Sequence, residues 1–250
     1  MASSKISRRE VLGLAGLGAV GLGLGALGIA RIAPQDAGEK ARKGDMLTVV
    51  TFGDSILDCG HYNQYGVHPG QLIVRNDDRL FPEFKGIDLA SQGEAHLEHR
   101  AVDGARVGGL PSQARGLHVE GPAVAMITIG GNDLLGGLVT DRGPGVRQFE
   151  QALEEFLRQL PIRPVLVGNV YDPSFADDNQ NFIGVEPKIA RENHRRVNAI
   201  LAEMGDKYGA LVDLHAHFLK GDPSWFTHTI EPSLTGASEV RRVFLPHILK

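Results

Sequence analysis

Four runs of apolar residues recur along the chain, and most of their members are β-branched or aliphatic. They span residues 47–52, 123–129, 164–170 and 210–214. Runs of β-branched and apolar residues of this length are typical of strands that are buried on both faces of a parallel sheet. A fifth strand, shorter and less regular, is predicted within 96–102.

Amphipathic helices are predicted between and after these strands. Apolar residues recur at helical spacing over 146–160, 187–208 and 234–249. Strands that alternate with helices predict an α/β fold, here a three-layer α/β/α domain with a central parallel sheet. In such domains ligands bind beyond the carboxyl ends of the strands, so the residues after each strand are the first candidates for chemistry.

The first thirty residues have the layout of a signal peptide. Lys5, Arg8 and Arg9 precede a charge-free stretch over 11–30 that contains seven glycines. Residues 7–12 resemble the twin-arginine export signal. We therefore expect a signal segment over 1–30, a linker over 31–45 and a domain over 46–250. Export by the twin-arginine (Tat) machinery to the periplasm or the exterior is expected, or membrane anchoring if the segment is not cleaved.

Composition narrows the possible functions. There are 26 Lys and Arg residues against 30 Asp and Glu, a formal net charge of −4, so nucleic-acid binding is not expected. The single cysteine, Cys59, excludes an internal disulfide and a cysteine-rich zinc site. Two Gly-x-Gly-x-x-Gly matches, at 16–21 and 23–28, follow no strand and are rejected as dinucleotide sites.

The residues that follow three of the predicted strands suit acyl transfer. Gly-Asp-Ser stands at 53–55, Asp-Gly-Ala at 103–105 and Gly-Gly-Asn-Asp at 130–133. Acyl transfer needs a nucleophilic hydroxyl at a sharp turn and hydrogen-bond donors for the oxyanion that forms. Ser55 can be the nucleophile, and the backbone N–H groups of Ser55 and Gly104 and the side-chain amide of Asn132 can be the donors.

These blocks together resemble the SGNH (GDSL) hydrolase family. Gly-Asp-Ser-Ile at 53–56 corresponds to its first block, Gly104 to its second, and 130–133 to its Gly-x-Asn-Asp block. The resemblance covers about 46–250 and implies the three-layer, flavodoxin-like fold of that family. It also implies an esterase that works through an acyl-serine intermediate without a metal or organic cofactor.

The fourth block departs from the family pattern. The family has Asp-x-x-His-Pro, in which His takes the serine proton and Asp orients the imidazole. The corresponding segment here, 228–232, reads His-Thr-Ile-Glu-Pro, so Glu231 stands at the His position and His228 at the Asp position.

Four assignments of the base stay open. His228 can be the base with Glu231 on its other nitrogen, or His215 or His217 can supply the base from the end of a strand. Glu231 can act directly if its pKa is raised. In the fourth, the domain keeps its oxyanion pocket and hydrolyses esters poorly or not at all.

Residues 213–217 also carry an Asp-x-His-x-His pattern, which holds metal ions in barrel amidohydrolases. Only thirty-three residues follow His217, too few for such a barrel, so a metal site is not expected and both histidines are interpreted as structural. Loop residues 61–84 and Tyr171, Asp172 and Pro173 are candidates for the pocket wall, although 69–80 can instead be a surface helix.

The sequence thus predicts an exported serine esterase acting on a small-molecule or carbohydrate ester. Two alternatives remain: a binding protein for an acylated ligand, and an acyltransferase, which shares the first half of the reaction and differs in the acceptor.

Overall fold

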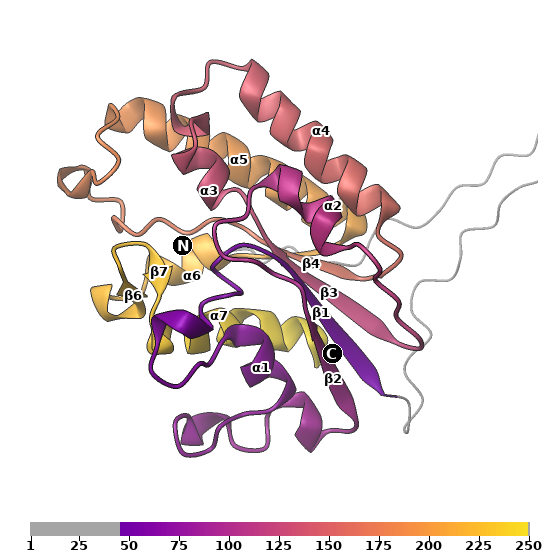
Figure 1. Cartoon of the computed structure of the whole chain (residues 1–250). Helices are drawn as coiled ribbons and strands as arrows, with labels where there is room; N and C mark the ends of the chain where they lie inside the picture. The colour runs from indigo at the N-terminus through magenta and orange to yellow at the C-terminus, as the bar shows by residue number, and fades with distance from the viewer. Residues whose placement is uncertain (1–45, 250) are drawn as a thin grey trace, which may run out of the picture. The chain divides into compact units, whose positions relative to one another are not determined.

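A five-stranded parallel sheet lies at the centre of the computed structural model, which describes residues 46–249 (Figure 1). The strands are β1 (Leu47–Gly53), β2 (Ala95–His99), β3 (Ala123–Thr128), β4 (Val165–Gly168) and β5 (Gly209–Val212). Their order is β2-β1-β3-β4-β5. The chain runs outward from β1 in both directions, so the carboxyl ends of β1 and β3 flank the switch point at which such sheets bind ligands.

Helices cover both faces of this sheet (Figure 1). They are α1 (Pro69–Val74), α2 (Leu110–Gln113), α3 (Gly131–Leu135), α4 (Pro144–Gln159), α5 (Pro187–Tyr208), α6 (Leu214–Phe218) and α7 (Leu234–Ile248). Side chains of α2, α3, α4 and α5 pack in one apolar cluster, and those of α1, α6 and α7 pack in the other. The predicted three-layer α/β/α fold is confirmed. The predictions for 1–45 concern residues outside the described range.

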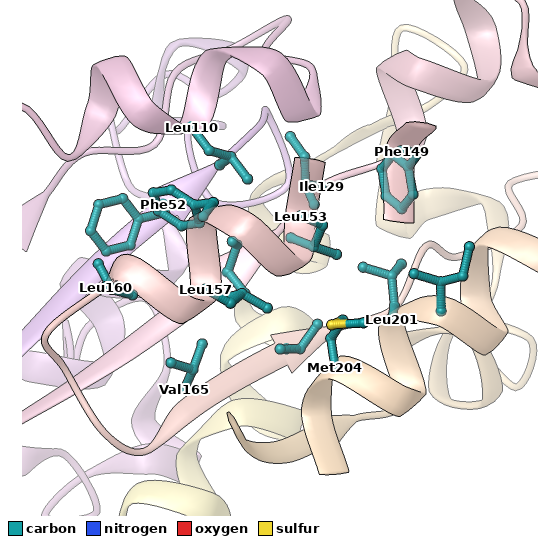
Figure 2. Close-up of a cluster of buried hydrophobic side chains, with 14 of the residues drawn as sticks. Phe52, Leu110, Ile129, Phe149, Leu153, Leu157, Leu160, Val165, Leu201 and Met204 are labelled. Carbon is teal, nitrogen blue, oxygen red and sulfur yellow. The ribbon is translucent and has the colours of Figure 1, made fainter. Parts of the chain in front are cut away.

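The pleat of β1 explains why its run of apolar and β-branched residues does not alternate with exposed polar ones. Val50 and Phe52 point into the cluster beneath α4 and α5, whereas Val49 points into the opposite cluster. Figure 2 shows the first cluster, in which the rings of Phe52 and Phe156 meet edge to face at 5.5 Å. Burial on both faces leaves no solvent-facing side, and the two threonines of the strand, Thr48 and Thr51, are buried as well.

A fully buried arginine lies in the second cluster. Arg241 of α7 donates to Asn76 Oδ1 at 2.6 Å, and its guanidinium lies 3.5 Å from the centre of the Phe84 ring. Burial lowers the pKa of Arg241 to about 10. The arginine therefore joins α7 to the loops that follow α1 from inside the core.

A two-stranded antiparallel hairpin, β6 (Phe226–Thr227) and β7 (Glu231–Pro232), precedes α7 and was not predicted. Tyr171 donates a hydrogen bond from its hydroxyl to the carbonyl of Ile230 at 2.7 Å, which fixes the hairpin against the loop after β4. None of the helices within 46–249 has both the length and the apolar character needed to cross a bilayer.

Candidate active site

Ser55 lies in the turn directly after β1 and is almost completely buried. The turn depends on Gly53, whose φ is +115°. A Cβ atom at Gly53 would stand 1.7 Å from the carbonyl oxygen of Thr128 on the neighbouring strand. Only glycine allows the chain to leave β1 this close to β3, and this close approach places Ser55 at the edge of the sheet.

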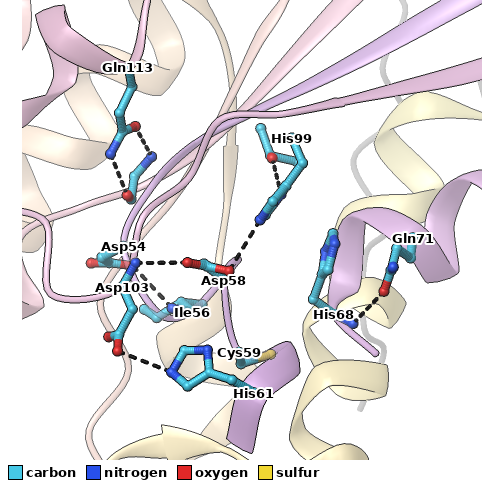
Figure 3. A network of polar contacts seen from close by, with 12 residues as sticks. Asp54, Ile56, Asp58, Cys59, His61, His68, Gln71, His99, Asp103 and Gln113 are labelled. Carbon is cyan, nitrogen blue, oxygen red and sulfur yellow. Dashed lines mark hydrogen bonds and ion pairs between the residues drawn. The ribbon is translucent and has the colours of Figure 1, made fainter. Parts of the chain in front are cut away.

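The Gly53 peptide is held from the other side by Gln113 of α2. Its N–H donates to Gln113 Oε1 at 2.7 Å, and Gln113 Nε2 donates to its carbonyl at 2.8 Å (Figure 3). Gln113 is buried, so this pair satisfies a backbone donor that water does not reach. Sequence reasoning missed Gln113 because no local pattern distinguishes it from other polar residues on a short helix.

The Asp54 carboxyl is hydrogen-bonded within the turn and to the neighbouring strand. Its buried carboxyl Oδ1 accepts hydrogen bonds from Thr128 Oγ1 at 2.9 Å and from the N–H of Ile56 at 3.2 Å. Burial raises its pKa to about 7, against the effect of these hydrogen bonds. Asp54 thus shapes the turn around Ser55.

The predicted oxyanion donors come from the loops after β2 and β3. Gly104 has a φ of +74° with no atom near the position of a Cβ, so backbone conformation and not lack of space requires glycine there. Asn132 lies in the first turn of α3, lines the same cavity as Ser55, and donates from Nδ2 to the carbonyl of Ala105 at 3.2 Å. The structure therefore brings Asn132 both to the loop of Gly104 and to the cavity of Ser55.

The loop that carries Gly104 is fixed by a polar network (Figure 3). The N–H of Asp103 donates to Asp58 Oδ2 at 2.9 Å, and His99 Nε2 lies 3.3 Å from Asp58 Oδ1. The Asp103 carboxylate accepts from the Tyr62 hydroxyl at 2.8 Å and lies 3.1 Å from His61 Nε2. The partners of Asp103 could not be found by a motif, because they come from the loop after β1, more than forty positions earlier in the chain.

Glu231 is the residue of the fourth block that reaches Ser55. The Ser55 side chain lies close enough to its carboxylate to favour the ionised form. Burial raises the pKa of Glu231 and the charge of Asp103 adds to this rise, whereas Ser55 and the nearby His61 and His228 oppose it. Its Oε2 is buried without a partner of good geometry among the described residues. A carboxylate with a raised pKa beside a serine hydroxyl can accept a proton from it.

His228 lies in the tight turn between β6 and β7. Its φ is 47°, and that of Thr229 is 74°, so both adopt left-handed backbone conformations. The His228 ring meets the Tyr62 ring edge to face at 5.3 Å. Within the described chain no contact joins His228 to Ser55, and the ring lies close enough to Glu231 to influence its charge. Its role as a base stays a prediction.

The two other candidate histidines have partners of their own. His217 Nε2 lies 2.8 Å from Glu239 Oε2, and its ring stacks on Trp225. The His215 ring lies 5.0 Å from the ring of His194. Over residues 46–249, no group of three or more His, Cys, Asp or Glu side chains is arranged to hold a metal ion.

A cavity of about 140 Å³ opens beside Ser55. Its wall is formed by α3, the segment 170–187 and the first turns of α5, and Tyr171, Asp172 and Pro173 are part of it. In the loop 61–84, residues 69–74 form α1, and Leu72 and Ile73 of this helix pack into the core. This part of the loop therefore supports the fold, and Tyr62 lies near the site.

Comparison with known proteins agrees with this geometry. Residues 51–237 match the GDSL-like lipase/acylhydrolase family. Three solved structures share the fold: an acetylxylan esterase from Geobacillus stearothermophilus, a lipase/acylhydrolase from Enterococcus faecalis, and an α/β hydrolase from the metagenome of Lake Arreo. No curated protein matches the chain at a significant level.

The three structures are distant in sequence. Their identities are 17%, 18% and 21%, with TM-scores of 0.56, 0.57 and 0.54. The matches cover 82%, 81% and 82% of this chain and 94%, 95% and 94% of theirs. The chain belongs to the GDSL-like lipase/acylhydrolase family and is a hydrolase of ester bonds, as the family resemblance of its sequence blocks predicted.

Proposed function

We propose that this protein is a serine esterase in which Ser55 forms the acyl-enzyme and Glu231 accepts the serine proton. The observation that carries the proposal is the position of the buried Glu231 carboxylate, which lies near the Ser55 side chain and has a raised pKa. Family membership supports the ester chemistry. The placement of Glu231 supports the assignment of the base, because Glu231 stands where the family pattern has its histidine.

The reaction follows from these groups. Ser55 Oγ bonds to the ester carbonyl carbon while its proton passes to Glu231, and the oxyanion accepts hydrogen bonds from the N–H groups of Ser55 and Gly104 and from the Asn132 amide. The carbon–oxygen bond to the alcohol then breaks, and Glu231 returns the proton to the departing oxygen. Water releases the acyl group by the same steps, with Glu231 again as the base.

Glu231 suits this role better in its buried position than an exposed glutamate would. A base acts best when its pKa lies near the working pH, and an exposed Glu titrates near 4.3. Burial and the charge of Asp103 both shift the pKa of Glu231 upward. His228 and His61 lie near the carboxylate and favour its charged form, so in this scheme they tune Glu231 and do not contact the serine.

Export through the twin-arginine (Tat) pathway to the periplasm or the exterior is part of the proposal. It rests on the paired arginines and the glycine-rich apolar stretch within residues 1–30. The substrate is proposed to be a small-molecule or carbohydrate ester, and an acyltransferase would share every step up to the acyl-enzyme.

The pH dependence of ester hydrolysis tests the assignment of the base. Glu231 must be ionised to act, so kcat/KM for p-nitrophenyl acetate is expected to rise with pH through a pKa above the ordinary value for Glu. Glu231→Gln keeps the size and a hydrogen-bond acceptor but is expected to lower kcat/KM by about 10²–10⁴-fold. Glu231→His is expected to move the rising limb toward the pKa of histidine. Full activity in Glu231→Gln would refute the role of Glu231.

A further inference from the structure

The cavity beside Ser55 has a wall that is mainly apolar. The apolar side chains of this wall come from α3, from the 3-10 helix η5 (Leu138–Thr140), from the segment between β4 and α5, and from α5 itself. They are Leu134, Leu135, Val139, Val170, Phe182, Ile183, Pro187 and Ala190. Leu135 and Phe182 both line this cavity and are both 43% exposed, so two large apolar side chains are accessible at one site. Water is a poor occupant of such a space.

The polar groups of the wall are already paired within the protein. Asp172 accepts hydrogen bonds from Ser174 Oγ at 2.6 Å and from Arg191 at 3.0 Å. Arg191 also pairs with Asp178, and His194 Nε2 lies 2.8 Å from the carbonyl of Val170. A sugar ring would need free donors and acceptors here, because its hydroxyls lose hydrogen bonds to water on binding. The pairing therefore favours an apolar group over a carbohydrate.

The position of the base decides whether the acyl half or the alcohol half of the ester enters the cavity. The departing alcohol oxygen must receive a proton, so it faces Glu231 in the proposed reaction. The cavity wall includes Ser55 and Asn132, but within the described residues neither Glu231 nor His228 lines it. The acyl group leaves the carbonyl carbon in another direction from the alcohol. The wall includes Ile230 but not the Glu231 side chain that serves as the base, so the cavity is assigned to the acyl group.

We propose that this cavity binds the aliphatic acyl chain of the substrate, with a preference for chains of about six carbons. The length follows from the volume of about 140 Å³, because an apolar cavity of about 150 Å³ accommodates benzene, a six-carbon molecule. The inference rests on the proposed function for its orientation, since Ser55 and Glu231 define which half is acyl. The substrate is then a lipophilic ester and not an acetylated sugar.

A chain-length series tests this proposal. The purified chain is assayed with p-nitrophenyl esters of acetic, butanoic, hexanoic and decanoic acids, which share one leaving group. Each buried methylene favours binding about fourfold, so kcat/KM for hexanoate is expected to exceed that for acetate by at least about tenfold and that for decanoate to fall again. An acetate value equal to or above the hexanoate value would overturn the proposal.

Three variants test whether the preference for longer acyl chains arises in the cavity. Ala190→Phe fills the space and is expected to lower the hexanoate-to-acetate ratio at least about fivefold. Ala199→Phe makes the same change at an exposed position of α5 and is expected to leave the ratio within about twofold. Phe182→Ser removes an apolar side chain at the opening without touching the core, so a lower ratio is expected even if Ala190→Phe fails to fold. An unchanged ratio in the folded variants contradicts the proposal.

A binding measurement separates this inference from the proposed function. Ser55→Ala cannot form an acyl-enzyme, and calorimetry is expected to show that it binds p-nitrophenyl hexanoate at least about tenfold more tightly than p-nitrophenyl acetate. Addition of Ala190→Phe is expected to remove the difference. If the chain hydrolyses no ester but this binding preference holds, the proposed function fails and the apolar site stands. If the acetate and hexanoate esters are hydrolysed with equal kcat/KM and bind with equal affinity, the inference fails and the proposed esterase function stands.

Discussion

The wild-type protein is expected to lose stability as the pH rises through the pKa of Asp54. Asp54→Asn is expected to remove a large part of this loss. The Asp54 carboxyl is buried, and burial raises its pKa from 3.8 to about 7. A group whose pKa is higher in the folded state stabilises the fold fully below its unfolded pKa, and this contribution is lost as the pH rises through the folded value. Asn keeps an oxygen that can accept from Thr128 and Ile56, but it does not ionise.

The size of the effect follows from the two pKa values. A rise from 3.8 to about 7 corresponds to about 4 kcal/mol of unfolding free energy between the protonated and the fully ionised limits. Roughly 2 to 3 kcal/mol of this falls between about pH 5 and about pH 8.

Urea unfolding at these two pH values measures the change. The difference in unfolding free energy, Asp54→Asn minus wild type, is expected to rise by that amount from the lower to the higher pH. The other titrating groups are shared by both proteins and cancel in the comparison. A difference that stays constant within about 0.5 kcal/mol would refute the assignment of a buried, neutral Asp54.

Two further substitutions probe the supports of the site and the core. Gln113→Ala leaves the buried N–H of Gly53 without its acceptor and is expected to lower the unfolding free energy by about 1 to 3 kcal/mol, with a fall in kcat because the Ser55 turn loosens. Equal stability and kcat would show that the turn does not need this clamp. Arg241→Ala opens a cavity in the core and strips the Asn76 oxygen of its donor, so a loss of about 3 to 5 kcal/mol is expected in urea unfolding. A loss below about 1 kcal/mol would mean that the cost of burying the Arg241 charge cancels the stabilisation from its contacts.

The layers of the fold could be predicted because each long element is periodic in its own sequence. The apolar run of 47–52 and the helical spacing over 187–208 reproduce β1 and α5 almost residue for residue. The edge strand β2 is half-buried along most of its length, so its pattern is weaker. The hairpin of β6 and β7 has only two residues in each strand and depends on Tyr171, which lies in a distant loop.

The site was predictable where chemistry is local in sequence and not where it depends on packing. The blocks around Ser55, Gly104 and Asn132 follow strands, and the sheet brings their loops together. Gln113 lies 60 positions from Gly53, the residue that it binds, and His61 lies 42 positions from Asp103. No pattern in one sequence reveals such contacts.

The choice between Glu231 and His228 needed the structure for a different reason. Both residues lie within one four-residue stretch, and the sequence allows either to face the serine. The left-handed backbone at His228 and Thr229 forms the turn before Glu231. The Glu231 carboxylate lies near Ser55, whereas the His228 ring meets Tyr62. Turn conformations of non-glycine residues with positive φ are not predictable from residue type.

The most direct test of the account is the rate at which a fluorophosphonate labels Ser55, with the adduct located by mass spectrometry. The account predicts an adduct on Ser55 in the wild-type chain, none at that site in Ser55→Ala, and a rate about 10²-fold or more lower in Glu231→Gln. His228→Gln is expected to slow labelling less than Glu231→Gln does. A folded wild-type chain that stays unlabelled, or a Glu231→Gln chain that is labelled as fast as the wild type, would contradict the claim that Glu231 activates Ser55.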